Sequence, residues 1–464
     1  MGVEEVKAVD TAADGAEEDS TFLSPPRKSR SKTRRLSSQS ATRADLFGPP
    51  TVVAPPDQLD SESNAHSTAE AMEMAKHHLA EGSETSTPDD SGPVTPDGTD
   101  LTTTDKYAFA FDIDGVLIRG GEVIPEAIEA MKVLNGENEW GIKVPYIFVT
   151  NGGGKTEEER CIQLSNQLKM EVSPGQFICG HTPMREMAEK YHTVLVVGGE
   201  GEKCRTVAEG YGFKDVITPG DIIKDNKDTT PFRKLTEEEL RNSKKRNYGE
   251  VDIEAVFVFA DSRDWAGDSQ IILDLCMSKN GRLGTRSETF DEGPPVYFSH
   301  NDIVWATSHS YSRIGMGALR ASLEAMFKAI TGKELKTIAF GKPQVGTFQF
   351  ATRLLQQWRK DTHGINRPPE TVYFVGDTPE SDIRGTNEFD ATAEDASWYS
   401  ILVRTGVFKE GTKPAYKPKM TVDNVLEAVK HGIQREFDKA VKDLTVGGAA
   451  PQMADAIAED DAEP

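Results

Sequence analysis

Apolar runs alternate with helix-like segments from residue 107 onward in this chain of 464 residues. A short, continuous apolar run predicts a buried strand, whereas apolar residues that recur every three or four positions predict a helix. The first pattern predicts strands at 107–111, 144–149, 192–199, 253–259, 336–340, 370–375 and 398–403. The second predicts helices at 124–134, 156–168, 202–209, 268–277, 316–330, 348–358 and 422–429. Strands that alternate with helices favour an α/β fold, in which helices cover both faces of a parallel sheet.

The chain divides into two tails, a core in two pieces and an insertion. Residues 1–104 are rich in Ser, Thr, Pro, Asp and Glu, which predicts a disordered tail, and the acidic stretch 445–464 predicts a second one. We expect the predicted strands and helices of 105–153 and 337–440 to form a Rossmann-like core. Residues 154–336 form a second α/β unit, which we expect to be an inserted cap domain.

Charge and composition narrow the range of partners. The formal net charge of −23 argues against nucleic-acid binding, which needs a basic face. No apolar run approaches the roughly 20 residues of a membrane span. The four cysteines have neither pairing nor metal-ligand spacing and are expected to be free thiols. A basic patch at Arg27–Arg35 is either an import or kinase-recognition signal or a solvated charge run. The acidic first residues favour a cytoplasmic location.

Two aspartates stand at the end of the first predicted strand. Asp112 and Asp114 follow the run 107–111, and Gly115 lets the backbone turn sharply after them. Ligands bind at the carboxyl ends of strands in open α/β sheets. Two close carboxylates repel each other, so one tends to keep a proton unless a metal is bound, which suits a nucleophile beside a general acid or base. Alone, the pair also fits an ordinary aspartate-rich turn.

Two further stretches supply groups that can hold a phosphoryl group. Thr150 and Asn151 follow the predicted strand 144–149, where the threonine hydroxyl and nearby backbone N–H groups can bind phosphoryl oxygens. Lys342 lies in a short loop after the strand 336–340 and can screen a carboxylate from the charge of a phosphate. Each stretch alone is weak evidence, because polar turns after strands are common.

A fourth stretch completes a candidate metal site. Asp377 ends the strand 370–375, and with Asp112 it would form a hard oxygen site of the kind that Mg²⁺ prefers. Asp382 can support this site by orienting the direct ligands without binding the metal itself. An acidic protein that handles phosphates needs cations at the site, and Mg²⁺ with one lysine can provide them.

Together these residues resemble the haloacid dehalogenase superfamily of Mg²⁺-dependent phosphohydrolases. Asp112–Gly115 resembles its first motif, Thr150 its second, Lys342 its third and Gly376–Asp382 its fourth. The insertion at 154–336 resembles the class IIA cap, which pyridoxal-phosphate, phosphoglycolate and nitrophenyl phosphatases share.

The resemblance implies a role for each motif residue. Asp112 would attack phosphorus and form an aspartyl-phosphate, and Asp114 would protonate the leaving oxygen and then activate water. Thr150 and Lys342 would hold the phosphoryl group. Asp112, the backbone carbonyl of Asp114 and Asp377 would bind Mg²⁺. The expected partner is a small phosphorylated substrate, and class IIA relatives often form homodimers through the cap.

Three stretches are similar to the cat eye syndrome critical region protein 5-like subfamily, namely 150–154, 300–305 and 398–407. This similarity brings no defined substrate, and it suggests mitochondria as a second location. Asn151 is followed by three glycines where class IIA members usually carry a second asparagine, so the substrates of those relatives do not transfer to this chain.

Several alternatives stay open at this stage. The chain is a phosphatase, a non-catalytic scaffold or regulator that keeps the fold, or a phosphotransferase or phosphatase of glycerophospholipid metabolism. Asn301 and Asp302 either reach the substrate or brace a loop of the cap. His181 either faces the site or is a hydrogen-bonded surface histidine.

Overall fold

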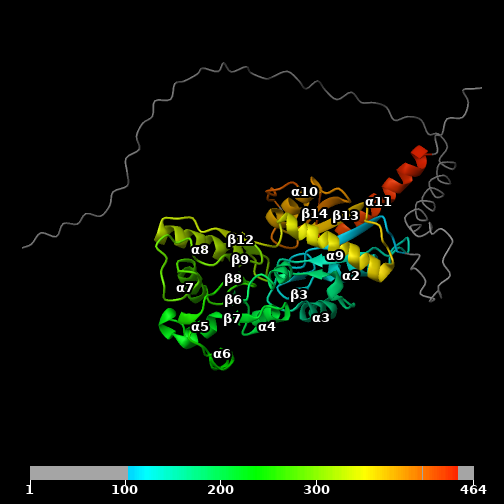
Figure 1. Cartoon of the computed structure of the whole chain (residues 1–464). Helices are drawn as coiled ribbons and strands as arrows, with labels where there is room; N and C mark the ends of the chain where they lie inside the picture. The colour runs from blue at the N-terminus through cyan, green and yellow to red at the C-terminus, as the bar shows by residue number, and fades with distance from the viewer. Residues whose placement is uncertain (1–102, 410, 448–464) are drawn as a thin grey trace, which may run out of the picture. The chain divides into compact units, whose positions relative to one another are not determined.

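The computed structural model describes residues 103–409 and 411–447 (Figure 1). The basic patch at Arg27–Arg35 and nearly all of both predicted tails lie outside these residues. Within them are two parallel sheets with their helices and two short antiparallel hairpins. All seven predicted strands and all seven predicted helices overlap observed ones, and the predicted α/β fold class is confirmed.

The larger, core sheet has six parallel strands in the order β15-β14-β13-β1-β4-β5. Its strands are β1 (Tyr107–Phe111), β4 (Tyr146–Val149), β5 (Phe177–Ile178), β13 (Thr371–Gly376), β14 (Ser397–Val403) and β15 (Met420–Val422). The helices on one face are α2 (Pro125–Leu134), α3 (Glu157–Leu168) and α11 (Val425–Gly447). Those on the other face are α9 (Val345–His363) and α10 (Arg384–Asp390).

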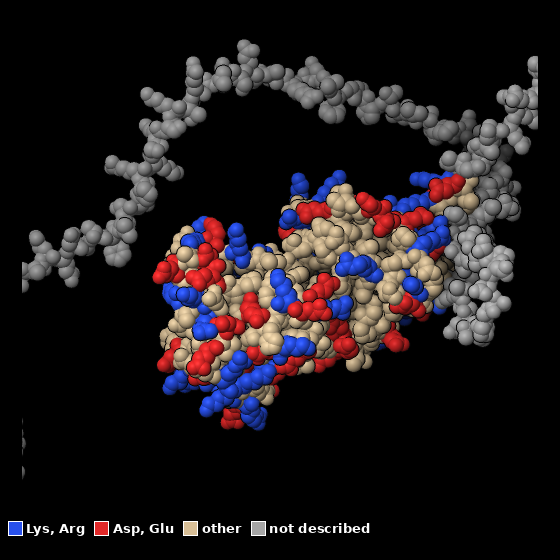
Figure 2. Space-filling model, in the orientation of Figure 1, with Lys and Arg blue, Asp and Glu red and all other residues tan. Residues whose placement is uncertain are grey.

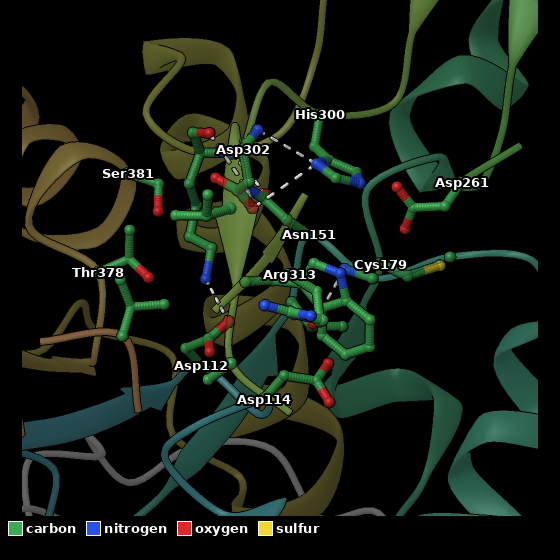
Figure 3. A pocket seen from close by; sticks show the side chains of 18 of the residues that line it. Asp112, Asp114, Asn151, Cys179, Asp261, His300, Asp302, Arg313, Thr378 and Ser381 are labelled. Carbon is green, nitrogen blue, oxygen red and sulfur yellow. Dashed lines mark hydrogen bonds and ion pairs between the residues drawn. The ribbon is translucent and has the colours of Figure 1, made fainter. Parts of the chain in front are cut away.

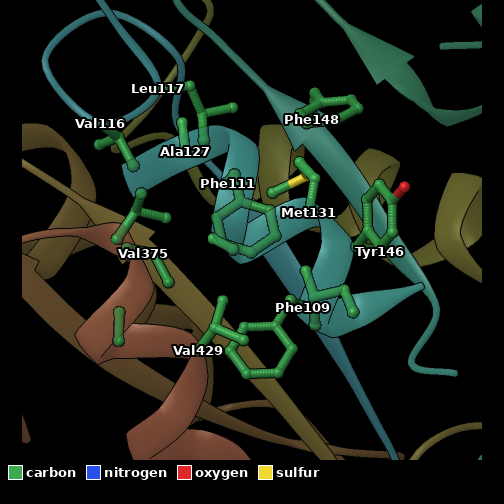
Figure 4. Packing of buried hydrophobic residues seen from close by; sticks show 14 of the residues in the cluster. Phe109, Phe111, Val116, Leu117, Ala127, Met131, Tyr146, Phe148, Val375 and Val429 are labelled. Atoms are coloured by element: carbon green, nitrogen blue, oxygen red, sulfur yellow. The ribbon is translucent and has the colours of Figure 1, made fainter. Parts of the chain in front are cut away.

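Strand β1 is apolar throughout because both of its faces are covered. Phe109 and Phe111 pack with Met131 of α2 and Val429 of α11 (Figure 4). Ala108 and its alternate neighbours face α9 and α10 instead. Successive side chains of a strand point to opposite faces of the sheet, so a strand buried on both sides reads as a continuous apolar run. The packing holds the carboxyl end of β1 at the centre of the sheet.

The second, cap sheet has five parallel strands in the order β12-β9-β8-β6-β7. Its strands are β6 (Thr193–Val197), β7 (Asp215–Ile217), β8 (Ala255–Val258), β9 (Val296–Phe298) and β12 (Thr337–Ala339). On one face lie α5 (Pro219–Asp225), α7 (Trp265–Cys276) and α8 (Met316–Thr331), and on the other lies α4 (Lys203–Gly210). The remaining α-helix of the cap region is α6 (Glu237–Asn242).

Short elements complete the described chain. The two hairpins are β2 (Ile118–Arg119) with β3 (Glu122–Val123), and β10 (Val304–Trp305) with β11 (Arg313–Ile314). The short helical turns are η1 (Pro174–Gln176), η2 (Thr182–Met187), η3 (Lys227–Thr229), η4 (Tyr248–Glu250) and η5 (Pro379–Ile383).

Two strands join a different sheet from the one that the sequence predicts. The strand predicted at 336–340 continues the core in sequence, but β12 pairs in parallel with β9 and belongs to the cap sheet. Strand β5 lies inside the predicted insertion 154–336, yet it pairs with β4 at the edge of the core sheet. A local apolar run predicts that a strand forms, whereas its partner depends on residues that are distant in sequence.

The ends of the described chain also differ from the prediction. Thr103 and Thr104 are buried, although the sequence predicts them as part of the N-terminal tail. Helix α11 runs to Gly447, beyond the helix end predicted at 429, because Ile433 and Phe437 continue its buried stripe at helical spacing.

Two further observations concern membrane-spanning helices and the state of the cysteines. None of the helices in the described part of the chain combines the length and apolar character that a bilayer crossing requires. All four cysteines are buried and free, as the sequence predicts.

Candidate active site

Polar side chains from three neighbouring core strands meet at one edge of the sheet. Strands β13, β1 and β4 are adjacent and parallel, so their carboxyl ends lie together. Asp112 and Asp114 follow β1, Thr150 follows β4, and Asp377 follows β13. All four line one cavity of about 560 Å³, which Lys342 also lines (Figure 3). The structure thus brings the predicted site residues together.

Lys342 is buried between two carboxylates. Its Nζ atom lies 2.5 Å from Asp112 Oδ1 and 2.8 Å from Asp382 Oδ1. Burial alone would lower the pKa of Lys342, but the two aspartates raise that pKa above its ordinary value. Lys342 is therefore a fixed positive charge beside Asp112. It follows β12 of the cap sheet, so the cap sheet helps to position it.

Three buried carboxylates share this one lysine. Asp112, Asp377 and Asp382 each offer an oxygen atom, and these atoms lie within 4.8 Å of one another. Burial raises the pKa of Asp112 well above its ordinary value, and burial together with Asp382 raises the pKa of Asp377 to about 7. When all three carboxylates are ionised, the positive charge of Lys342 offsets one of them and leaves a net charge of minus two. Hard oxygen donors with excess negative charge are the ligands that Mg²⁺ prefers, so this set fits a divalent cation.

Asp382 is oriented by backbone donors. Its Oδ2 atom accepts hydrogen bonds from the backbone N–H groups of Asp377, at 3.0 Å, and Thr378, at 2.9 Å. Its other carboxylate oxygen pairs with Lys342. Asp382 therefore contacts both the lysine and the loop that carries Asp377.

The loop after β14 holds Asp377 in place, and the sequence did not single it out for this purpose. The backbone N–H of Val407 donates to Asp377 Oδ2 at 2.6 Å, and the Thr405 hydroxyl donates to the carbonyl of Gly115 at 2.5 Å. A Cβ atom on Gly406 would lie 1.8 Å from Asp377 Oδ2. The only local signal is a glycine just after a buried strand, which many unrelated turns share.

Gly115 is required for a similar reason. Its φ of +96° is a conformation that side chains rarely adopt, and a Cβ atom there would lie 2.2 Å from Asp377 Oδ2. The turn expected after Asp114 is therefore present, and it brings the first and fourth motifs into contact.

Asp114 lies on the wall of the cavity (Figure 3). Burial raises the pKa of its carboxyl group, while the positive charges of Arg160 and Lys342 oppose this shift. A carboxyl group with a raised pKa keeps its proton closer to neutral pH, which is a property of general acids.

Thr150 and Asn151 differ in how far their side chains are free to bind a ligand in the cavity. Thr150 Oγ1 lies in the cavity lining and accepts a hydrogen bond from the Gly152 N–H at 3.0 Å. The Asn151 amide donates to Asp302 Oδ2 at 2.9 Å and to the Lys342 carbonyl at 3.1 Å, and it accepts from the Lys342 N–H at 2.8 Å. The Asn151 side chain therefore fixes Lys342 and Asp302.

The hydrogen bonds of Asn301 and Asp302 favour a role in bracing a loop of the cap over direct contact with the substrate. Asn301 Oδ1 accepts a hydrogen bond from Arg320 at 3.0 Å, and Asp302 accepts one from Asn151 (Figure 3). His181 is fully buried rather than at the surface, and its Nδ1 lies 2.7 Å from the hydroxyl of Tyr211. That hydroxyl in turn donates to a carboxylate oxygen of Glu157 in α3.

Fold and site together define a class of α/β proteins in which loops after adjacent parallel strands assemble a buried, oxygen-rich site around one lysine. The family model described as haloacid dehalogenase-like hydrolase matches residues 109–214. A second model, described as HAD-hydrolase-like, matches residues 339–428. The two matches contain the four motifs, and the chain belongs to the haloacid dehalogenase-like hydrolases.

Two curated yeast proteins are similar over most of this chain. The mitochondrial hydrolase YKR070W of Saccharomyces cerevisiae is 38% identical over 72% of this chain and 97% of its own length. The cardiolipin synthase (CMP-forming)/mitochondrial hydrolase fusion protein of Schizosaccharomyces pombe is 40% identical over 73% of this chain. The chain spans only about half of that fusion protein, 55% of its length.

Among solved structures, the p-nitrophenyl phosphatase from Archaeoglobus fulgidus is 18% identical, with a TM-score of 0.46. The match covers 70% of this chain and 99% of that one.

Proposed function

We propose that this hydrolase is a Mg²⁺-dependent phosphatase that acts on a small phosphorylated metabolite through an aspartyl-phosphate. The observation that carries the proposal is the buried set of Asp112, Asp377 and Asp382 around Lys342. A purely structural protein gains nothing from three carboxylates that repel one another in its interior. A phosphatase needs them for a nucleophile and a cation site.

In the first half of the proposed reaction, a carboxylate oxygen of Asp112 attacks phosphorus. The bond between phosphorus and the leaving oxygen breaks, and Asp114 gives its proton to that oxygen. In the second half, Asp114 takes a proton from water as the water oxygen attacks phosphorus. The bond between phosphorus and Asp112 then breaks, and inorganic phosphate leaves.

Lys342 and Thr150 would hold the phosphoryl oxygens during both steps. Lys342 is already charged and within 2.5 Å of Asp112, so it is placed to offset the charge of an incoming phosphate. Thr150 offers its hydroxyl on the cavity wall. We propose that Asn151, which the sequence predicts as a phosphate ligand, acts mainly by positioning Lys342.

Asp112, Asp377 and the backbone carbonyl of Asp114 would hold Mg²⁺, with Asp382 orienting the loop around them. When bound, the cation would neutralise the excess carboxylate charge and draw charge from the phosphoryl oxygens. The second α/β region would act as the class IIA cap, since His300 and Asp302 line the same cavity as Asp112. A cavity of about 560 Å³ suits a small metabolite.

The test is phosphate release from a panel of phosphorylated metabolites, with Mg²⁺ or with a chelator. We expect release that requires Mg²⁺ and is lost in Asp112→Asn. Asp228→Asn is the matched control, because Asp228 is exposed in η3, away from the cavity. Folded protein that releases no phosphate from any compound in Mg²⁺ would contradict the proposal and favour the scaffold alternative.

A second candidate function is supported by one specific observation. The Schizosaccharomyces pombe relative joins its hydrolase to a cardiolipin synthase in one chain. Enzymes joined in one chain often act on related compounds, so a phosphorylated glycerophospholipid belongs in the panel. Release from this lipid in detergent micelles, at a rate above that of every soluble compound, would favour the second candidate.

Location and assembly are separate proposals. Both yeast relatives are named as mitochondrial, which supports a mitochondrial location for this chain over a cytoplasmic one. Fractionation of cells that express the full chain would decide between the two. A homodimer through the cap stays a prediction that sedimentation can test.

A further inference from the structure

The cavity is also lined by positive side chains from both the core and the cap region. Lys155 and Arg160 lie just before and within α3 of the core, and Arg263 precedes α7. Arg313 lies on β11 (Figure 3). None of these residues belongs to the four motifs. They form what we call the outer cation set, defined as Lys155, Arg160, Arg263 and Arg313.

Within the described residues, no member of the outer cation set is in an ion pair. Lys155 Nζ donates to the side-chain oxygen of Gln163 at 3.0 Å, and Arg263 donates to the carbonyl of Asp261 at 2.8 Å. Arg313 donates to the neighbouring carbonyl of Ser312 at 3.1 Å. These three side chains thus have neutral hydrogen-bond partners. The charge of Arg160 acts on the carboxyl group of Asp114, and the charges of Lys155 and Arg263 act on Glu200, in each case without a close ion pair.

Several cations elsewhere on the cap region have acidic partners. Arg246 pairs with Asp215 at 2.7 Å, and Arg282 pairs with Asp252 at 2.7 Å. Figure 2 shows Lys and Arg interspersed with Asp and Glu over one face of the molecule. In a chain with a net charge of −23, four cations around one cavity that are outside any close ion pair are available to an anionic ligand.

The phosphoryl group alone does not account for these cations. Lys342 already pairs with Asp112 and Asp382 at the inner end of the cavity, and the carboxylates there suit a divalent cation. Arg263 and Arg313 come from the cap region, and both are exposed to solvent. A ligand that reaches them must extend beyond its reacting phosphate.

We propose that the outer cation set binds a second anionic group of the substrate. The substrate class is then a phosphomonoester whose organic part carries a carboxylate, a second phosphate or a phosphodiester. This inference rests on the proposed phosphatase function and specifies its substrate. Trp265, Trp305 and Ile314 also line the cavity, and they offer the organic part of the substrate an apolar surface.

Two compounds that differ in one charged group give a direct test. Phosphoglycerate and glycerol phosphate share a three-carbon chain and a phosphomonoester, but only the first has a carboxylate. We expect kcat/KM for phosphoglycerate to exceed that for glycerol phosphate by about tenfold or more, the effect of one charged hydrogen bond. A sugar bisphosphate is expected to exceed the matching monophosphate in the same way.

Substitution of the cap arginines tests the assignment to residues. Arg313→Gln and Arg263→Gln should each reduce the phosphoglycerate-to-glycerol phosphate ratio, and the double variant should bring it close to one. Arg241→Gln is the matched control, because Arg241 is exposed on α6 and does not line the cavity. A ratio that is unchanged in the double variant would overturn the assignment.

Measuring the affinity for the two compounds tests the inference in a variant that does not hydrolyse them. In the Asp112→Asn variant, calorimetry should show tighter binding of phosphoglycerate than of glycerol phosphate, and Arg313→Gln should remove the difference. Equal affinities would overturn the inference even if the protein hydrolyses both compounds. Tighter phosphoglycerate binding without Mg²⁺-dependent phosphate release from any compound would instead support the anion site and contradict the proposed phosphatase.

An additional assay with a lipid substrate tests whether the second anion belongs to a soluble metabolite or to a phospholipid. A phosphorylated glycerophospholipid in micelles carries a phosphodiester beside its phosphomonoester. Hydrolysis of this lipid that depends on Arg313 and Arg263 would support the inference with the phosphodiester as the second anion. Lipid hydrolysis that is insensitive to both arginines, together with a ratio near one for the soluble pair, would overturn it.

Discussion

Asn151 Nδ2 lies 2.9 Å from Asp302 Oδ2, and this hydrogen bond joins the loop after β4 to the loop before β10. The same amide group bonds the backbone of Lys342 through both its nitrogen and its oxygen. One buried side chain thus fixes the lysine beside Asp112 and a loop of the cap region. Site geometry and contact with the cap are therefore coupled.

Asn151→Ala should weaken both the fold and the site. The substitution removes three hydrogen bonds and leaves the buried carboxylate of Asp302 without this donor, so we expect a loss of about 2–3 kcal/mol in the free energy of unfolding. Urea denaturation measures this loss, and phosphate release should fall with it. Asn242→Ala, on the exposed side of α6, should change neither quantity. Equal stability of the two variants would show that the Asn151 hydrogen bonds contribute little.

Lys342→Met should destabilise the chain through its two carboxylate partners. Removing one partner of a buried ion pair typically costs about 3–5 kcal/mol, because a charge is left without compensation. Combining it with Asp112→Asn removes one of the stranded carboxylates, so the double variant should be more stable than Lys342→Met alone. Denaturation of the two single variants and the double variant measures this coupling, with the exposed Lys360→Met as the control. Additive effects would contradict the coupling between Lys342 and Asp112.

Gly406→Ala should displace Asp377 and weaken Mg²⁺ binding. The new Cβ atom would lie 1.8 Å from Asp377 Oδ2, so the carboxylate must move. We expect the rise in melting temperature produced by Mg²⁺ to need about tenfold more cation than in the parent. Gly346→Ala is the control, since a Cβ atom there meets nothing within 4 Å and alanine favours a helix. An unchanged Mg²⁺ dependence would argue that Asp377 is not a ligand.

Acid should destabilise the chain through His181. Burial lowers the pKa of His181 to about 4, although Glu157 opposes the shift, whereas the unfolded value is 6.5. Below pH 6.5 the unfolded chain gains a proton that the folded chain excludes, so this contribution is complete above 6.5 and is lost as pH falls toward about 4.

His181→Gln removes this titration. Between about pH 6.5 and about pH 5, the parent should lose roughly 2 kcal/mol more unfolding free energy than the variant, since one pKa unit corresponds to about 1.4 kcal/mol. Urea denaturation at the two pH values measures the difference. His309→Gln, on an exposed loop, should keep the parental pH dependence. A parallel decline in the parent and His181→Gln would contradict the assignment to His181.

The sequence predicts the motif residues of this site well because each is a local feature. Asp112, Thr150 and Asp377 all follow apolar runs that are unmistakable as strands, and the ends of neighbouring parallel strands meet by geometry. Lys342 was also identified, but its strand was assigned to the wrong sheet because strand pairing is set by distant residues.

Other parts of the site have no local signature. Val407 acts through its backbone N–H group, and Gly406 acts by leaving space that a side chain would fill. Neither property can be recognised from a pattern of apolar residues. Arg263 and Arg313 reach the cavity only because a loop and a hairpin of the cap region are folded over it. Strands β7 and β9 have three residues each, too few to give a reliable pattern.

The central claim is that Asp112 carries the phosphoryl group during the reaction. The most direct measurement is mass spectrometry of protein quenched in acid during turnover with the best substrate of the panel and Mg²⁺. We expect a mass gain of one phosphoryl group on the peptide that contains Asp112, and no gain in Asp112→Asn. Continued phosphate release with the phosphoryl group on another residue, or with undiminished activity in Asp112→Asn, would contradict it.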